Sequence, residues 1–207
     1  MPKKELKKEK KTKPNKKVRK KVVVSRKELY DLERQMVSLL RTNHGGQLWH
    51  WSINVPLVDK RWDAVLAGSP ELLPKLQTAN KKLSVLSLGC GFCMYWPLMQ
   101  EYGVREFTGV DLFDTRKADT GQSLLGTTQK LVDKFCSESQ TKLVEGDVRD
   151  LDELLSKNGK KSKKKYDIIN SVSVDYEKLG STGIPKSLFD SVCEKYLKKN
   201  GLSVYVP

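Results

Sequence analysis

The sequence predicts an α/β protein with a Rossmann-like, doubly wound and mostly parallel sheet of five strands in the order 3-2-1-4-5. Residues 83–88 form a short apolar run that ends at Gly89-Cys90-Gly91, and an apolar stretch of helical length follows. A second apolar run, 107–110, ends in Asp111, which lies 22 positions after Gly89. This order is typical of a nucleotide-binding βαβ unit, whose acid about 20 residues beyond the glycines accepts hydrogen bonds from ribose hydroxyls.

The glycines indicate what kind of ligand the turn accepts. Gly89 lets the backbone turn sharply out of the strand, and Gly91 lets a ligand approach the main chain where a Cβ would collide. The dinucleotide fingerprint GxGxxG has a third glycine at the position of Met94. Its absence disfavours a pyrophosphate cofactor and favours a nucleoside-like one.

Residues 87–93 resemble the first motif of class I S-adenosylmethionine-dependent methyltransferases, acid-x-Gly-x-Gly-x-Gly. Ser87 stands in place of the acid and Cys93 in place of the last glycine. The resemblance covers about residues 83–207 and implies methyl transfer from S-adenosyl-L-methionine. It places Gly89 and Gly91 against the methionine part of that cofactor and Asp111 on its ribose. The cofactor-binding residues expected from it are Gly89, Cys90, Gly91, Asp111, Leu112, Asp147, Val148 and Asn170.

The later elements follow the same alternation of helix and strand. A long amphipathic helix is expected first, and a helix ended by Asn200-Gly201 precedes the last strand. The expected elements are a helix at 123–136, strands at 142–148 and 166–172, a helix at 187–198 and a strand at 202–206.

Asp147 has two interpretations. The resemblance implies that its carboxylate accepts from the adenine amino group while the backbone amide of Val148 contacts the ring. The alternative is that Asp147 caps the helix that follows it.

Positive charge is concentrated at the N-terminus. The chain has 207 residues and a formal net charge of +14, and residues 1–21 carry twelve Lys or Arg and two Glu. Residues 157–165, here called the lysine loop, add six lysines, so the rest of the chain is close to neutral. Residues 1–24 are predicted to be a disordered basic tail. Residues 1–21 are a candidate contact for RNA or another polyanion, or they only keep the protein in solution.

Two further parts follow the tail: residues 25–80 as an N-terminal helical cap and lid, and residues 81–207 as the cofactor-binding core. No apolar run approaches the about 20 residues of a membrane span, and the N-terminus has no apolar signal region. The sequence therefore predicts an intracellular protein, cytoplasmic or, in a eukaryote, nuclear.

The cap is predicted to contain two helices with a lid between them. Ser25 has the spacing of a capping box, and its helix runs to about residue 41. Residues 47–53 are expected to be a packed or extended lid in which His50, between Trp49 and Trp51, is either a general base or simply packed. The second helix is expected at 69–79.

The cysteines suggest an alternative chemistry. Cys90 and Cys93 form a C-x-x-C after a strand, the context of a thioredoxin-like redox pair. Gly89 stands where such sites usually carry Trp, and neither Cys136 nor Cys193 supplies a second ligand pair for a metal. The nucleoside interpretation accounts for more of the chain.

The acceptor of the methyl group is less constrained. No catalytic residue is predicted, because methyl transfer depends mainly on alignment and on exclusion of water. Asn170 is followed by Ser-Val-Ser, which is unlike the patterns of enzymes that methylate DNA amino groups. Asp175 and Tyr176 are possible substrate contacts. RNA is the first expectation, since residues 172–176 and the helix ending at Gly201 faintly resemble messenger-RNA cap methyltransferases.

Three alternatives remain open: a protein acceptor, a small-molecule acceptor, or an inactive methyltransferase-like subunit. The usual C-terminal antiparallel strand pair of the resembled fold is missing after residues 202–206. That strand is therefore expected to be an exposed edge that pairs with a partner or with a second copy.

Overall fold

The computed structural model describes most of the predicted core and only part of the cap. The described residues are 59–78, 82–93, 95–113, 124–156, 162–172 and 184–206, together with Lys27, Asp31, Arg34 and Ser38. These last four are helical and exposed, and they lie within the helix expected after Ser25. Several predictions fall outside the described residues: those for residues 1–24, for the lid at 47–53 with His50, and for Met94, Asp175 and Tyr176.

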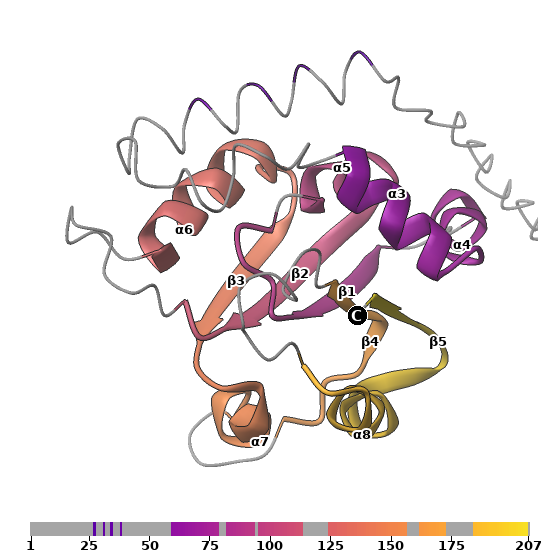
Figure 1. Cartoon of the computed structure of the whole chain (residues 1–207), viewed down its shortest axis with the longest axis vertical. Helices are drawn as coiled ribbons and strands as arrows, with labels where there is room; N and C mark the ends of the chain where they lie inside the picture. The colour runs from indigo at the N-terminus through magenta and orange to yellow at the C-terminus, as the bar shows by residue number, and fades with distance from the viewer. Residues whose placement is uncertain are drawn as a thin grey trace, which may run out of the picture.

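A five-stranded parallel sheet with the order β3-β2-β1-β4-β5 forms the centre of the molecule, as Figure 1 shows. The predicted fold class and strand order are therefore confirmed. The central strand is apolar because helices cover both of its faces, and all six of its residues are buried. The strands are β1 (Leu83–Leu88), β2 (Val104–Asp111), β3 (Gln140–Glu145), β4 (Tyr166–Val172) and β5 (Leu197–Val206).

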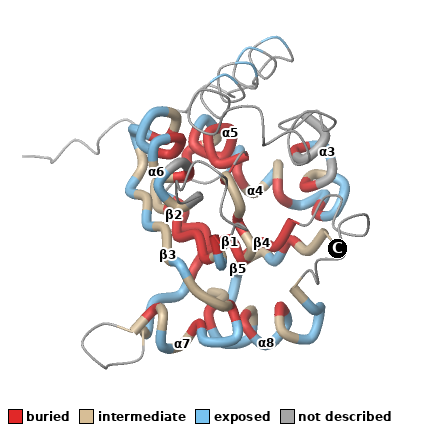
Figure 2. Tube along the Cα trace, turned by 60° about the vertical axis from the view of Figure 1, so that its left-hand side comes forward, coloured by how far each residue is buried: buried red, intermediate tan, exposed pale blue. Residues whose placement is uncertain are grey.

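Helices pack on both faces of the sheet and create two cores. One face is covered by α3 (Asp59–Gly68), α4 (Leu72–Thr78), α5 (Trp96–Glu101) and α6 (Leu124–Phe135), and the other by α7 (Leu151–Leu154) and α8 (Lys186–Tyr196). Figure 2 shows buried residues concentrated in the sheet between these layers. Trp62 of α3 and Leu72 of α4 lie in the same core as the sheet, so these two helices are built into the body of the fold.

The predicted end of α8 is wrong. The helix ends at Tyr196, and β5 begins at the next residue, so Asn200 and Gly201 lie inside the strand. Tyr166 pairs with Leu197 and Ile168 with Leu202, so β4 advances by two residues while β5 advances by five. The three extra residues form a bulge in β5, and the Asn-Gly pair lies in it. Glycine is needed at position 201 because a Cβ there would lie 2.5 Å from Cδ1 of Leu197.

Other boundaries shift for local reasons. The apolar stretch after Gly91 is only partly helical: α5 begins at Trp96, with Pro97 in its first turn, after a non-helical turn. Strand β3 ends at Glu145, and Val148 lies in a short 3-10 helix, η2 (Val148–Asp150), rather than in the strand as predicted. Helix α3 was not predicted.

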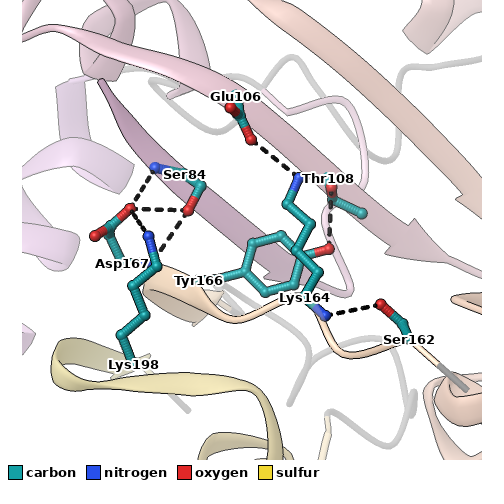
Figure 3. Close-up of polar contacts among 8 residues, drawn as sticks. All are labelled: Ser84, Glu106, Thr108, Ser162, Lys164, Tyr166, Asp167 and Lys198. Carbon is teal, nitrogen blue, oxygen red and sulfur yellow. Dashed lines mark hydrogen bonds and ion pairs between the residues drawn. The ribbon is translucent and has the colours of Figure 1, made fainter. Parts of the chain in front are cut away.

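A polar cluster joins three strands at the amino edge of the sheet (Figure 3). The buried Asp167 carboxylate accepts from Ser84 N at 3.0 Å, from Ser84 Oγ at 2.9 Å and from Lys198 Nζ at 2.8 Å. Lys164, in the described end of the lysine loop, pairs with Glu106 at 3.1 Å. This end of the loop therefore lies opposite the carboxyl ends of the strands, as expected for a loop that leads from a helix into a strand of a doubly wound sheet.

Among the residues that the structure describes, no helix combines the length and the apolar character that a membrane span requires.

Candidate functional site

The predicted site residues meet at the carboxyl edge of the sheet. Leu88 pairs with Val110, so the turn after β1 begins beside the end of β2. Gly89 N donates to Val110 O at 2.8 Å, and Gly146 N donates to Asp111 O at 2.9 Å. These bonds align the ends of β1, β2 and β3, which is where doubly wound proteins bind their ligands.

The glycine turn is left-handed at alternate positions. The backbone φ is 61° at Gly89, 49° at Gly91 and 55° at Cys93. These are the three positions at which the resembled motif has glycine, and Cys93 adopts the glycine conformation although it has a Cβ. A left-handed residue with a Cβ costs about 1–2 kcal/mol, so the surrounding fold holds Cys93 in this conformation.

The two glycines differ in their surroundings. A Cβ placed on Gly91 would meet no described atom within 4 Å, so this side of the turn is open. A Cβ placed on Gly89 would lie 3.3 Å from Cδ1 of Ile184, the residue that leads into α8. The opening therefore lies over Gly91, while Ile184 packs against Gly89.

Asp111 connects the end of β2 to the glycine turn. Its Oδ2 accepts from the backbone N of Gly91 at 2.8 Å, and its Oδ1 accepts from the backbone N of Phe113 at 2.9 Å. Each carboxylate oxygen has a second lone pair, so two acceptor positions remain for a ligand. Leu112, between Asp111 and Phe113, is 53% exposed and presents an apolar surface at this edge of the sheet.

Asp147 caps η2, which agrees with the capping alternative. Its Oδ1 accepts from the backbone N of Arg149 at 2.8 Å, and its carboxylate also pairs with the Arg149 guanidinium. Hydrogen bonds from the Arg149 side chain and backbone lower the pKa of Asp147 to about 2. Asp147 and Val148 lie beyond the end of β3, and their contact with an adenine ring stays a prediction.

Asn170 lies deeper, in β4, and is 1% exposed. Its Oδ1 accepts from the hydroxyl of Tyr95 at 2.7 Å, whereas its Nδ2 has no hydrogen-bond partner. Sequence reasoning did not identify Tyr95 as a site residue. Tyr95 belongs to the segment between the glycine turn and α5, and no local pattern indicates a partner 75 residues away.

Ser87 does not reach the site. It is fully buried, pairs with Gly109 and Asn170 on the neighbouring strands, and its Oγ accepts from Trp96 Nε1 at 2.9 Å. Trp96 packs so closely on β2 that a Cβ on Gly109 would lie 2.9 Å from its ring. A glycine inside a strand is the sequence signal for such a close approach.

The buried cysteines do not have the character of a redox pair. Cys93 N donates to Cys90 O at 2.9 Å, which closes a four-residue turn. Burial and the neighbouring Cys90 raise the pKa of Cys93 well above its usual value, and burial raises the pKa of Cys136 to about 12. Both thiols of the C-x-x-C are buried, whereas reactive cysteines lie in partly exposed positions. Within the described ranges, no group of three His, Cys, Asp or Glu side chains is arranged to hold a metal ion.

A polar pocket of about 280 Å³ lies at the other edge of the sheet. Lys82, Arg105, Glu106 and residues 137–140 line it, near the starts of β1, β2 and β3. It is separate from the site formed at the strand ends.

Comparison with known proteins gives structural likeness alone. No family model matches the sequence, and no curated protein matches it. The structure is similar to YjhP from E. coli, with 13% identity over 83% of this chain and 55% of that one and a TM-score of 0.47. It is also similar to an S-adenosyl-L-homocysteine complex of a SAM-dependent methyltransferase from Thiobacillus denitrificans, with 15% identity over 83% and 54% of the two chains and a TM-score of 0.46.

A third similar structure is protein arginine methyltransferase 10 from Arabidopsis thaliana, with 20% identity over 70% of this chain and 34% of that one and a TM-score of 0.41. The chain thus spans about half the length of the first two structures and a third of the last. All three likenesses have TM-scores below 0.5. From its own strand order and glycine turn, the described part of the chain has the Rossmann-like fold expected of class I S-adenosylmethionine-dependent methyltransferases.

Proposed function

We propose that the protein binds S-adenosyl-L-methionine and transfers its methyl group to an acceptor. The observation that supports this most is the turn at Gly89, Gly91 and Cys93, which is left-handed at each position where the resembled motif has glycine. The Asp111 carboxylate holds this turn through Gly91 N and keeps free lone pairs for ribose hydroxyls.

The residues present fit an adenosyl sulfonium. The open side of Gly91 leaves room for the ligand next to the backbone, and the exposed Leu112 supplies an apolar contact beside Asp111. Asn170 offers a buried donor without a partner. When bound, the cofactor supplies a methyl group on a positively charged sulfur. The role of the chain is to position this group, to align the acceptor with it and to exclude water.

RNA is the acceptor that we propose first. Its support is the charge of residues 1–21, which carry twelve Lys or Arg and would hold a polyanion. A protein or a small molecule is the alternative acceptor. The described end of the lysine loop lies at the amino edge, so we assign that loop no part in guiding the acceptor to the turn.

Isothermal titration with S-adenosyl-L-methionine and S-adenosyl-L-homocysteine tests the proposed function. We expect a dissociation constant of about 1–100 μM for the purified full-length chain, and a loss of at least about tenfold in Asp111→Ala. Asp150→Ala removes an exposed carboxylate in η2 and is the matched control with unchanged affinity. Equal affinity in the wild type and Asp111→Ala contradicts the ribose assignment, and absence of binding contradicts the function.

A second candidate is a non-catalytic subunit that keeps the fold. Ser87 favours it, because the residue in place of the motif acid is buried under Trp96 and offers the ligand no charge. This candidate predicts a folded chain that binds neither ligand in the same titration.

A further inference from the structure

Asn170 presents an unsatisfied donor in the interior. Among the described residues, its Nδ2 is the only buried side-chain nitrogen or oxygen without a hydrogen-bond partner. Buried polar groups are nearly always paired, because an unpaired one loses its hydration without compensation. The other end of the amide is fixed, since Oδ1 accepts from the Tyr95 hydroxyl at 2.7 Å. The NH2 group therefore points away from Tyr95, and the described residues supply no acceptor for it.

The position of this donor relates it to the glycine turn. Asn170 pairs in the sheet with Ser87, two residues before Gly89. Tyr95 follows Cys93, the last left-handed residue of the turn. The Asn170–Tyr95 pair thus connects β4 to the segment that carries the turn.

The backbone of the turn has few donors to offer. Gly89 N and Cys90 N both donate to Val110 O, Gly91 N donates to Asp111 Oδ2, and Cys93 N donates to Cys90 O. An anionic ligand group at this turn would therefore find four of its five amides already bonded. The Arg149 guanidinium, in η2 beyond the end of β3, is paired with Asp147.

We propose that Asn170, oriented by Tyr95, donates through Nδ2 to the carboxylate at the methionine end of the cofactor. The inference rests on the proposed function and specifies which ligand atoms β4 recognises. An amide NH2 pairs with carboxylate oxygen and not with the ammonium group beside it. Asn170 thereby favours S-adenosyl-L-methionine over adenosyl ligands that lack the carboxylate.

The test compares S-adenosyl-L-methionine with its decarboxylated form by isothermal titration. A hydrogen bond to a charged group corresponds to about 10- to 100-fold in affinity. We expect Asn170→Ala to weaken binding of the carboxylate ligand by that factor and to change binding of the decarboxylated ligand by less than about twofold. Tyr95→Phe removes the hydroxyl that orients the amide and should give a smaller loss in the same direction.

Two further variants separate recognition from folding. Gln100→Ala removes another buried amide, which accepts from Glu138 N and Ser139 Oγ near the starts of β2 and β3. It should lower the melting temperature and leave the preference for the carboxylate unchanged. Asn170→Ser keeps a donor and should retain part of the preference if Asn170→Ala does not fold.

The outcomes distinguish the inference from the proposed function. Equal affinity of the wild type for both ligands, or an equal loss for both in Asn170→Ala, overturns the inference and leaves the function standing. Failure of the wild type to bind either ligand overturns both.

Discussion

The Asp111 carboxylate accepts a 2.8 Å hydrogen bond from the backbone N of Gly91. It joins the end of β2 to the turn after β1, two segments that the sequence separates by 20 positions. The acid predicted to hold a ribose therefore also holds the turn that would face the ligand. A change at Asp111 should affect both binding and local stability.

The stability effect can be measured without a ligand. Asp111→Asn keeps one acceptor oxygen, now uncharged, and replaces the other by an NH2 donor, so either the Gly91 or the Phe113 amide loses its acceptor. We expect a decrease of about 1–3 kcal/mol in the free energy of unfolding in urea. A variant as stable as the wild type would contradict this role of Asp111.

Gly109 is predicted to be irreplaceable. A Cβ there would lie 2.7 Å from Cys90 Sγ and 2.9 Å from the Trp96 ring, and both side chains are buried. Gly109→Ala should therefore cost about 1–3 kcal/mol or more in urea unfolding. Gly126→Ala is the control: Gly126 is exposed in α6 with open space around it, and this change should stabilise the helix by about 0.5–1 kcal/mol. Similar effects of the two changes would show that the packing of Trp96 on β2 is wrong.

Cys93 tests the left-handed turn. A β-branched side chain is especially unfavourable at a φ of 55°, so Cys93→Val should cost about 2–3 kcal/mol. Cys93→Gly should cost less, because relief of strain offsets the loss of the buried sulfur. Cys136→Val is the control at a buried position without positive φ. The melting temperatures of the variants test this prediction. A higher melting temperature for Cys93→Val than for Cys93→Gly would contradict the left-handed conformation of Cys93.

Asp167 makes stability dependent on pH in the acid range. Burial raises the pKa of this carboxyl, but hydrogen bonds from Lys198 and Ser84 outweigh burial and hold the pKa below the usual 3.8. The stabilisation is therefore complete above about pH 4. It is lost as the pH falls through the folded-state value, because the unfolded chain takes up the proton first.

Asp167→Asn should flatten the dependence of the free energy of unfolding on pH below about pH 4. Asp190→Asn, which breaks an exposed pair with Lys186, should change stability by less than about 1 kcal/mol. If the free energy of unfolding of Asp167→Asn fell with pH below about pH 4 as it does in the wild type, Asp167 would not be the group responsible.

Residues 1–21 are predicted to carry RNA affinity. Their deletion should weaken binding of a single-stranded RNA and reduce the slope of log affinity against log salt, by about 0.7 for each phosphate that these residues neutralise. A chain with these residues in scrambled order should behave as the wild type, since charge and not sequence is responsible. An unchanged slope after deletion would remove the support for RNA as the acceptor.

The sequence predicts elements best where local pattern and tertiary environment agree. Strands β1 and β4 are short, fully buried segments rich in apolar residues that helices cover on both faces, and both have the predicted bounds. The predicted end of α8 was wrong because Asn-Gly is a strong local signal for the end of a helix. In this fold Asn200-Gly201 instead lies in a bulge of β5. Asp111 was identifiable from its spacing to the glycines. The contact of Tyr95 with Asn170 was not, because it depends on how α5 packs across the sheet.

The central claim is that an adenosyl ligand binds over Gly91 at the carboxyl edge of the sheet. The most direct measurement is a titration of isotope-labelled protein with S-adenosyl-L-homocysteine, followed by amide resonances in NMR. The account predicts the largest shifts at Gly91, Leu112 and the side-chain NH2 of Asn170, with little change at Lys82 and Arg105 on the opposite edge. Shifts confined to that opposite edge, or no shifts with the ligand in excess, would contradict it.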